Sequence, residues 1–348
     1  MASPGIAPPV AFGLLEYLGG RLGVSGLRYE REPVPITDGW ETYVYRFQLQ
    51  DRSGLACPLG RPLIFRGYAC AHGLPRLRRE FAAQEYLHRL GYPVARPVLL
   101  EESCVPFGGP FMLMEALPGR PLVELLLHRP WRIWGGPAQM ADVHARLHRL
   151  TTDGFPASPE PFLGRRLAEM EGLIDEYRLR GLRPGLDWLR SHRPAEPRRP
   201  SIIHLDFHPL NLMFDQDRCS GVVDWCECDV GDRHADIAAT LVLFWSAPVE
   251  IPTYLQRLIA WPGRSMLRRR YLRAYRRHLS LNRRTLAYYV AWAALRRLCG
   301  WGRWLRAGPC STGSKPSVLR YLSPESVGVV GQCFHQWSGV PVSLAYGD

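Results

Sequence analysis

The chain has 348 residues, of which 46% are hydrophobic and 22% charged, as is ordinary for a globular protein of two domains or two lobes. Its longest mostly apolar run, Ile237 to Val249, is too short to cross a bilayer, and the N-terminus lacks the basic segment of a signal peptide. The nine cysteines form no CxxC pair, so we expect reduced thiols in a cytoplasmic protein rather than a zinc ribbon or a disulfide framework.

Arginine dominates the basic residues, which give the chain a formal net charge of +12. All but one of the 44 basic residues are arginines, the exception being Lys315, and they are spread along the sequence. In the densest stretch, Arg264 to Arg284, apolar and aromatic residues recur at helical spacing, namely Leu267, Tyr271, Leu272, Tyr275 and Leu279. We therefore expect a helix with a solvated arginine face; RNA binding by this helix is the alternative.

The first third of the chain is rich in strand patterns. Segments with Val, Ile, Tyr and Phe are bounded by Gly, Pro and Asp, which predicts strands at 27–36, 42–50, 61–68, 96–103 and 110–117. Residues 75–91 fit a helix that ends at Gly91.

After Pro118–Pro121 the pattern becomes mostly helical. Met140, Val143, Leu147 and Leu150 form an apolar stripe, and further helices are predicted at 163–192, 236–246, 252–279 and 284–306. The tail after about residue 308 shows no assignable pattern. We therefore predict an α+β protein with a small β-rich lobe, residues 1–117, and a larger, mainly helical lobe, residues 118–348.

One stretch, His204 to Trp225, concentrates polar residues among apolar ones. Asp206 and Asn211 are five residues apart, and Asp224 follows in the second arm of a predicted hairpin, which would bring it back close to Asn211. A carboxylate that accepts a proton, together with an amide and a second carboxylate that bind a hard cation, is what phosphoryl transfer requires. The spacing matches the catalytic-loop pattern H-x-D-x-x-x-x-N followed by a metal-binding Asp.

The same stretch resembles the aminoglycoside phosphotransferase and choline kinase-like family, whose members have a protein-kinase-like fold. The family pattern H-G-D-x-H-x-x-N is matched here from His204 to Asn211, with Leu205 in place of the Gly, and is followed by Asp224-Trp225. The segment from Asp229 to Ala238 is similar to the family's G-D-P-x-x-D-L-A, in which Asp236 would be a structural residue.

The resemblance implies roles for individual residues. Asp206 would be the catalytic residue, and Asn211 and Asp224 would bind Mg²⁺. Adenine would be bound by main-chain groups near Glu115 and Leu117 in a hinge. Gly39 stands where a nucleotide-covering loop belongs, in the predicted nucleotide-binding lobe.

The phosphate-binding cation of this family is usually a Lys on the third strand, although Arg also occurs there. Lys315 lies in the tail, so Arg66 is the candidate, and it can bind phosphate oxygens in bidentate fashion. Its partner should be a Glu on the inward face of the following helix. At 100° per residue, Glu80 lies between the apolar positions of that helix and Glu85 lies outside them, so we predict an Arg66–Glu80 ion pair.

These observations predict an ATP- and Mg²⁺-dependent phosphotransferase that transfers the γ-phosphate to a hydroxyl of a small molecule such as an aminoglycoside, choline or a sugar. Acidic residues at 169–177 and 226–229 would suit a cationic acceptor, whereas the arginine excess would suit an acidic or phosphorylated one. The alternative is a pseudokinase-like module that binds nucleotide or a protein partner without turnover.

Several histidines have more than one interpretation. His144 and His148 are four residues apart, but the HExxH pattern is missing, so we expect packing or surface roles rather than zinc. His204 should be a hydrogen-bonded support of the loop, while His208 would either orient the loop or contact the substrate.

Overall fold

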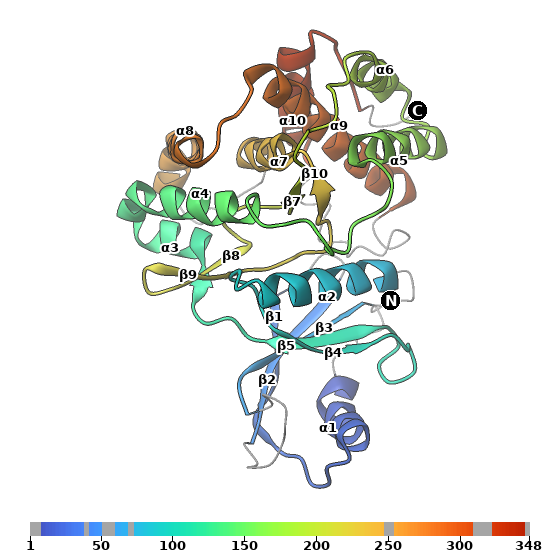
Figure 1. The fold of residues 1–348 in the computed structure, drawn as a ribbon, viewed down its shortest axis with the longest axis vertical. Helices are drawn as coiled ribbons and strands as arrows, with labels where there is room; N and C mark the ends of the chain where they lie inside the picture. Colours follow the sequence, from blue (N-terminus) through green and yellow to red (C-terminus); the bar gives the residue numbers. More distant parts are fainter. Residues whose placement is uncertain are drawn as a thin grey trace. The chain divides into compact units, whose positions relative to one another are not determined.

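Figure 1 shows the computed structural model of the chain, which describes residues 8–37, 42–50, 60–68, 73–246, 254–308 and 322–344. The chain divides into two units. The first comprises Met1–Pro118 with Gly313–Lys315, and the second comprises Gly119–Thr312 with Pro316–Asp348. No helix of the described segments combines the length and the apolar character that a bilayer crossing requires.

The first unit is built on a five-stranded antiparallel sheet with the order β1-β2-β3-β5-β4. Its strands are β1 Tyr29–Thr37, β2 Thr42–Leu49, β3 Leu63–Tyr68, β4 Pro97–Glu101 and β5 Phe111–Glu115. All five lie within the predicted segments or within one residue of them. Two helices accompany the sheet: α2 Leu74–Arg89, as predicted, and α1 Pro8–Leu22, which the sequence did not reveal.

Alternate residues of the sheet point into two different apolar clusters, as the two-residue period of a strand requires. On one face, Phe65 of β3 packs in a cluster with Leu14 and Leu18 of α1. On the other face, Tyr68 of β3 packs in a cluster with Leu77 of α2. Each helix therefore covers its own face of the sheet.

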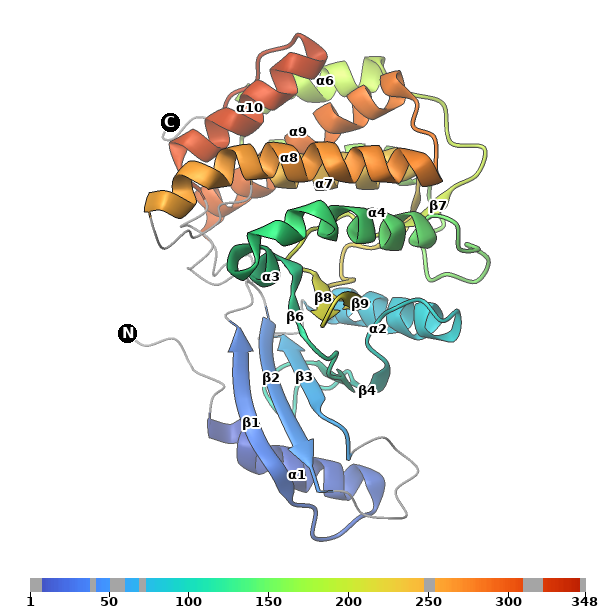
Figure 2. The same cartoon turned by 90° about the vertical axis from the view of Figure 1, so that its left-hand side faces the viewer.

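The second unit contains two small sheets and most of the helices (Figure 2). In one sheet, β8 Leu212–Asp215 pairs with both β6 Arg120–Pro121 and β9 Arg218–Val222. In the other, β7 Ser201–Ile203 pairs with β10 Asp229–Gly231. The β8–β9 pair is the hairpin predicted from the sequence, but its second strand begins at Arg218 and ends at Val222, so Asp224 follows the strand instead of lying in it.

A glycine is required where the second unit begins. Gly119 has a φ of +91°, and a Cβ placed on it would lie 1.9 Å from the carbonyl oxygen of Phe214 in β8. No larger residue fits this close approach of two backbones without displacing β6 from β8.

Helices form the rest of the second unit: α3 Leu122–His128, η2 Pro130–Trp134, α4 Gly136–Leu147, α5 Phe162–Glu176, η3 Arg180–Leu182, α6 Arg183–Ser191, α7 Arg233–Ser246, α8 Tyr254–His278, α9 Arg283–Ala307 and α10 Pro324–Ser338. The helical stretch predicted at 163–192 is interrupted near Arg178, whose φ is +54°. The unassigned tail contains α10, which begins at the cap Ser323 and packs against α9.

Candidate active site

The predicted catalytic loop follows β7, and two of its residues are bonded directly to each other. The side-chain amide nitrogen Nδ2 of Asn211 lies 3.0 Å from Asp206 Oδ2 and 3.0 Å from the carbonyl oxygen of Asp206. Because the NH₂ group faces Asp206, the amide oxygen of Asn211 points away from that carboxylate. The amide therefore orients Asp206 and presents its own oxygen in another direction.

The β8–β9 hairpin brings Asp224 back to the loop. The N–H of Val223 donates to the carbonyl oxygen of Asn211 at 2.9 Å, so the residue before Asp224 is fixed beside Asn211. Asp224 itself has a φ of +68°, in the left-handed region that a non-glycine residue adopts only at a cost of about 1–3 kcal/mol. The predicted proximity of Asp224 to Asn211 is confirmed.

His204 supports the loop from within the core. Its Nε2 donates to the carbonyl oxygen of Val223 at 3.0 Å, and its Nδ1 accepts the N–H of Asp206 at 3.2 Å. The side chain is buried, and this burial lowers the pKa of His204 despite the carboxylates around it. A neutral imidazole therefore joins the loop to the hairpin, which confirms the predicted support role.

Asp206 keeps a partly exposed carboxylate, with 35% of its side chain accessible. Burial of the carboxylate alone would raise the pKa of Asp206, but the nearby His208, His204 and Arg297 hold it well below its usual range. His208 Nε2 lies 3.4 Å from Asp206 Oδ1, and His208 Nδ1 accepts the N–H of Leu210. Asp206 is therefore ionised at neutral pH, and His208 contributes to its orientation.

The backbone of the loop is bound by a buried carboxylate from α7. Asp236 Oδ2 accepts the N–H of His204 at 2.6 Å, and Oδ1 accepts the N–H of Leu205 at 2.7 Å. Burial would raise the pKa of Asp236, but His144 and His148 hold it far below its usual range. Leu205 has a φ of +64°, which explains why the resembling family usually has Gly at this position.

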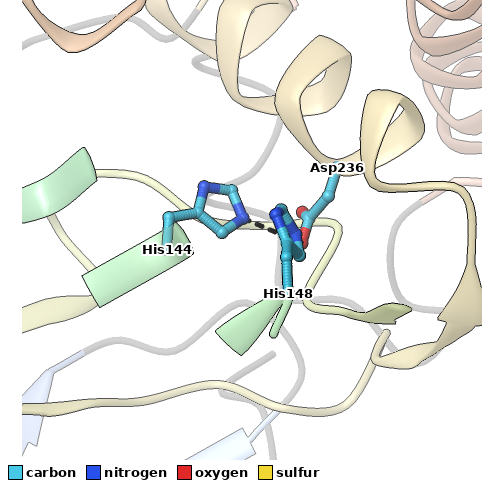
Figure 3. Close-up of side chains that lie close together, drawn as sticks. All are labelled: His144, His148 and Asp236. Atoms are coloured by element: carbon cyan, nitrogen blue, oxygen red, sulfur yellow. Dashed lines mark hydrogen bonds and ion pairs between the residues drawn. The ribbon is translucent and has the colours of Figure 1, made fainter. Parts of the chain in front are cut away.

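His144 and His148 lie side by side against Asp236, as Figure 3 shows. The Nε2 atoms of His144 and His148 lie 2.9 Å and 3.1 Å from Asp236 Oδ2. On the opposite side of the rings, His144 Nδ1 lies 2.6 Å from the hydroxyl of Tyr271, and His148 Nδ1 lies 2.7 Å from that of Tyr275. Burial lowers the pKa of His144 to about 4.

This cluster has the composition of a metal site but is organised as a hydrogen-bond network. Both nitrogens of each ring already have a protein partner, so Asp236, α4 and α8 are joined by a chain of donors and acceptors. Of the two predicted possibilities, packing or surface, both histidines take the buried position. Tyr271 and Tyr275 were visible in the sequence only as members of an apolar stripe.

Arg66 and Glu80, in the first unit, form an ion pair. Arg66 lies on the α2 face of β3, the face that also carries Tyr68, and its Nε is 3.2 Å from Glu80 Oε2. Glu80 is fully buried, and its other carboxylate oxygen accepts from Gln84 Nε2 at 3.3 Å. The sequence predicted Glu80 as the partner because it lies on the apolar side of the helix. Glu85, which was rejected, is exposed.

The segment after β5 presents main-chain groups. The N–H of Glu115 donates to the carbonyl oxygen of Arg96, and the N–H of Ala116 donates to that of Pro62. The next N–H, that of Leu117, has no hydrogen-bond partner among the residues that the structure describes. Gly39 lies outside the described residues.

Comparison with solved structures places this architecture among known phosphotransferases. A candidate aminoglycoside phosphotransferase from Ralstonia eutropha JMP134 superposes with a TM-score of 0.65 at 18% identity, over 94% of this chain and 98% of that one. A thermostable mutant of aminoglycoside phosphotransferase APH(4)-Ia, in a ternary complex with ADP and hygromycin B, has a TM-score of 0.61 at 14% identity, over 94% and 100%.

A macrolide 2'-phosphotransferase, MphH from Brachybacterium faecium, has a TM-score of 0.51 at 17% identity, over 92% of this chain and 97% of that one. These likenesses show the α+β, protein-kinase-like fold. No curated protein matches the sequence significantly. The sequence model of the phosphotransferase enzyme family matches residues 32–297. The chain is therefore a member of the phosphotransferase enzyme family.

Proposed function

We propose that the protein transfers the γ-phosphoryl group of ATP to a hydroxyl of a small molecule in a Mg²⁺-dependent reaction. The observation that carries the proposal is the arrangement of Asp206, Asn211 and Asp224 on one loop and its adjoining hairpin. Family membership supports phosphotransfer to a small molecule. The described cysteines are all free thiols, which agrees with a reaction in the cytoplasm.

Asp206 would orient the acceptor hydroxyl and accept its proton. The transition state of phosphoryl transfer is loose, so the proton leaves late, when the new P–O bond has begun to form. A carboxylate with a lowered pKa is suited to this task because it is ionised before the acceptor arrives. Asn211 and His208 hold the carboxylate in place through the contacts described above.

Asn211 and Asp224 would hold the metal ion. The amide oxygen of Asn211 faces away from Asp206, and Asp224 supplies a carboxylate, so both offer the hard oxygen ligands that Mg²⁺ prefers. When bound, Mg²⁺ would neutralise charge on the transferred phosphoryl group.

The residues of the first unit would bind the nucleotide. Glu80 holds the guanidinium of Arg66, which would contact the phosphate oxygens. The N–H of Leu117 would donate to adenine, and the carbonyl oxygen of Glu115 would accept from it. The side chain of Glu115 has a separate role because it lies 3.5 Å from Arg61 and 3.8 Å from Arg96.

Thermal unfolding with ATP alone, Mg²⁺ alone and both together tests the nucleotide site. A ligand at 100 times its Kd stabilises the native state by about 2.7 kcal/mol, so we expect a clear rise in Tm only when both are present. Asp224→Ala should lose this rise. Asp215→Ala, an exposed carboxylate in the same hairpin, should keep it. No rise at saturating ATP and Mg²⁺ in the wild type would contradict the proposal.

Turnover separates an enzyme from a pseudokinase-like module. We expect slow release of ADP from ATP with water as the acceptor, and Asp206→Asn should reduce this rate while leaving the Tm rise intact. A protein that binds Mg²⁺ and ATP but gives equal rates for wild type and Asp206→Asn would be a binding module.

A further inference from the structure

Helix α9 brings two adjacent arginines to the catalytic loop within the second unit. Arg296 Nη1 donates to the carbonyl oxygen of Leu205 at 3.5 Å, and Arg296 Nη2 lies 2.7 Å from Glu227 Oε2. The next residue, Arg297, is among the cationic groups that lower the pKa of Asp206. The two arginines differ in whether they have ion-pair partners, and this difference indicates the charge of the acceptor.

Arg296 belongs to a network in which acidic and basic side chains are balanced. The carboxylates are Glu169, Glu227 and Asp229, and the guanidinium groups are Arg165, Arg166 and Arg296. Arg166 lies 3.0 Å from Glu169, 3.6 Å from Glu227 and 3.8 Å from Asp229. The acidic residues of this network, which would otherwise attract a cationic acceptor, are therefore already paired with arginines.

Arg297 makes no hydrogen bond and no ion pair within the part of the chain that the structure describes. Its Nε is buried without a partner, and its guanidinium carbon lies 4.8 Å from the ring centroid of Trp301. Trp301, one turn further along α9 and almost fully buried, fixes the direction of the guanidinium. Burial lowers the pKa of Arg297 to about 10, which still leaves the group charged at neutral pH.

A charged, partly buried guanidinium with no carboxylate within ion-pair distance is costly unless a ligand supplies the anion. We infer that Arg297 binds an anionic group of the acceptor, so that the acceptor is a hydroxyl compound bearing a phosphate or a carboxylate rather than a polycation. The planar guanidinium offers the paired donors that such oxyanions accept. This inference rests on the proposed function.

The reaction of such an acceptor follows the same course. The acceptor hydroxyl oxygen forms a bond to the γ-phosphorus, the bond from that phosphorus to the β–γ bridging oxygen breaks, and ADP leaves. The hydroxyl proton passes to the carboxylate of Asp206. The anionic group on Arg297 is unchanged and serves to place the hydroxyl next to Asp206.

Calorimetric titration in the presence of saturating Mg²⁺ and ADP tests this inference, because the nucleotide site is then filled. The anionic probes are ribose 5-phosphate, glycerol 3-phosphate and glycerate; ribose is the neutral probe and hygromycin B the cationic one. We expect at least one anionic probe to bind more tightly than ribose and hygromycin B. Arg297→Gln should weaken it about tenfold or more, the size of one charge-assisted contact.

Two further variants serve as controls. Arg297→Lys keeps the charge and should lose less affinity than Arg297→Gln. Arg284→Gln removes an exposed arginine from the same helix and should bind the anionic probe within twofold of the wild type. Equal losses of affinity in Arg284→Gln and Arg297→Gln would show that only the net charge of the protein matters, and would overturn the inference.

Other outcomes would also overturn it. One is tighter binding of hygromycin B than of every anionic probe, and another is no binding of any anionic probe. A third is an Arg297→Gln variant that loses affinity for AMP-PNP, titrated in place of ADP, but keeps its affinity for the anionic probes; this result would assign Arg297 to the γ-phosphate. Failure of Mg²⁺ and ADP themselves to bind would instead contradict the proposed function, and the two failures are read in separate titrations.

Discussion

Asn211 donates its side-chain amide to Asp206, with Nδ2 3.0 Å from Asp206 Oδ2. The bond fixes which atom each side chain presents to a ligand. The carboxylate of Asp206 is oriented by an N–H donor, and the oxygen of Asn211 remains directed elsewhere. In the proposed mechanism this single contact would orient Asp206 to accept the proton and leave the oxygen of Asn211 to bind the metal.

Replacing Asn211 by Asp should disturb Asp206 as well as the metal site. The variant puts a second carboxylate next to the first, and a neighbouring like charge raises a carboxyl pKa. We expect the acidic limb of the pH profile of kcat/KM to move to higher pH and kcat to fall about 100-fold or more. An unchanged acidic limb would show that the two side chains do not interact in solution.

Glu80→Gln and Glu85→Gln form a matched pair on α2. Glu80 is buried beside Arg66, whereas Glu85 is exposed. Loss of the Glu80 charge should release Arg66 from its position and raise the KM for ATP about tenfold, because one charge-assisted contact is worth roughly 1.5–3 kcal/mol. Glu85→Gln should change the KM by less than twofold. Equal effects in steady-state kinetics would contradict a positioning role for Glu80.

The stability of the protein should fall in mildly acidic solution. The ordinary pKa of 6.5 is lowered to about 4 in folded His144, so between these values the unfolded chain binds a proton that the folded chain does not. The free energy of unfolding therefore decreases as the pH falls from about 6.5 to about 4, by up to about 1.4 kcal/mol per pH unit from this group.

Urea unfolding at several pH values measures that slope. His144→Gln is expected to flatten it, although the variant will be less stable at every pH. His128→Gln, in an exposed residue, should retain the wild-type slope. If His144→Gln and the wild type show parallel pH dependence, the buried network does not control acid stability.

Gly119→Ala should destabilise the second unit. The added Cβ would lie 1.9 Å from the Phe214 carbonyl oxygen at a positive φ, so β6 must move away from β8; we expect a loss of more than about 2 kcal/mol in the free energy of unfolding. Gly172→Ala in α5 has open space around the new methyl group and should stabilise by about 0.5–1 kcal/mol. Similar effects of both changes would contradict the steric argument.

Local patterns predicted the features that depend on neighbouring residues. The Val, Ile, Tyr and Phe content of short segments located the five strands of the sheet, and the helix phase placed Glu80 on the side of α2 that contacts Arg66. The spacing of Asp206 and Asn211, five positions apart, identified the loop, although their direct hydrogen bond was not predicted. In each case the information lies within one element or between two that are adjacent in the chain.

Features that depend on residues far apart in the chain could not be predicted from the sequence. Helix α1 is rich in Gly and Pro, so its sequence alone did not indicate a helix. Its apolar residues Leu14 and Leu18 pack in one cluster with Phe107, which lies far away in the chain. The hydroxyls of Tyr271 and Tyr275 have partners 127 residues earlier in the chain. The acidic segments at 169–177 and 226–229 left the charge of the acceptor open, and the pairing of Glu227 with Arg296 of α9, 69 residues away, could not be predicted from sequence spacing.

The carboxylate of Asp236 has a consequence for how the sequence can change during evolution. It accepts N–H groups from His204, Leu205, His144 and His148 at once, and the two imidazoles in turn engage hydroxyls of α8. Replacing one member leaves a buried neighbour unsatisfied, so neutral drift at these positions requires coordinated substitutions. We expect natural relatives to exchange the Tyr271 and His144 pair together, and Tyr271 and Tyr275 of α8 to vary in step with the loop whose backbone Asp236 binds.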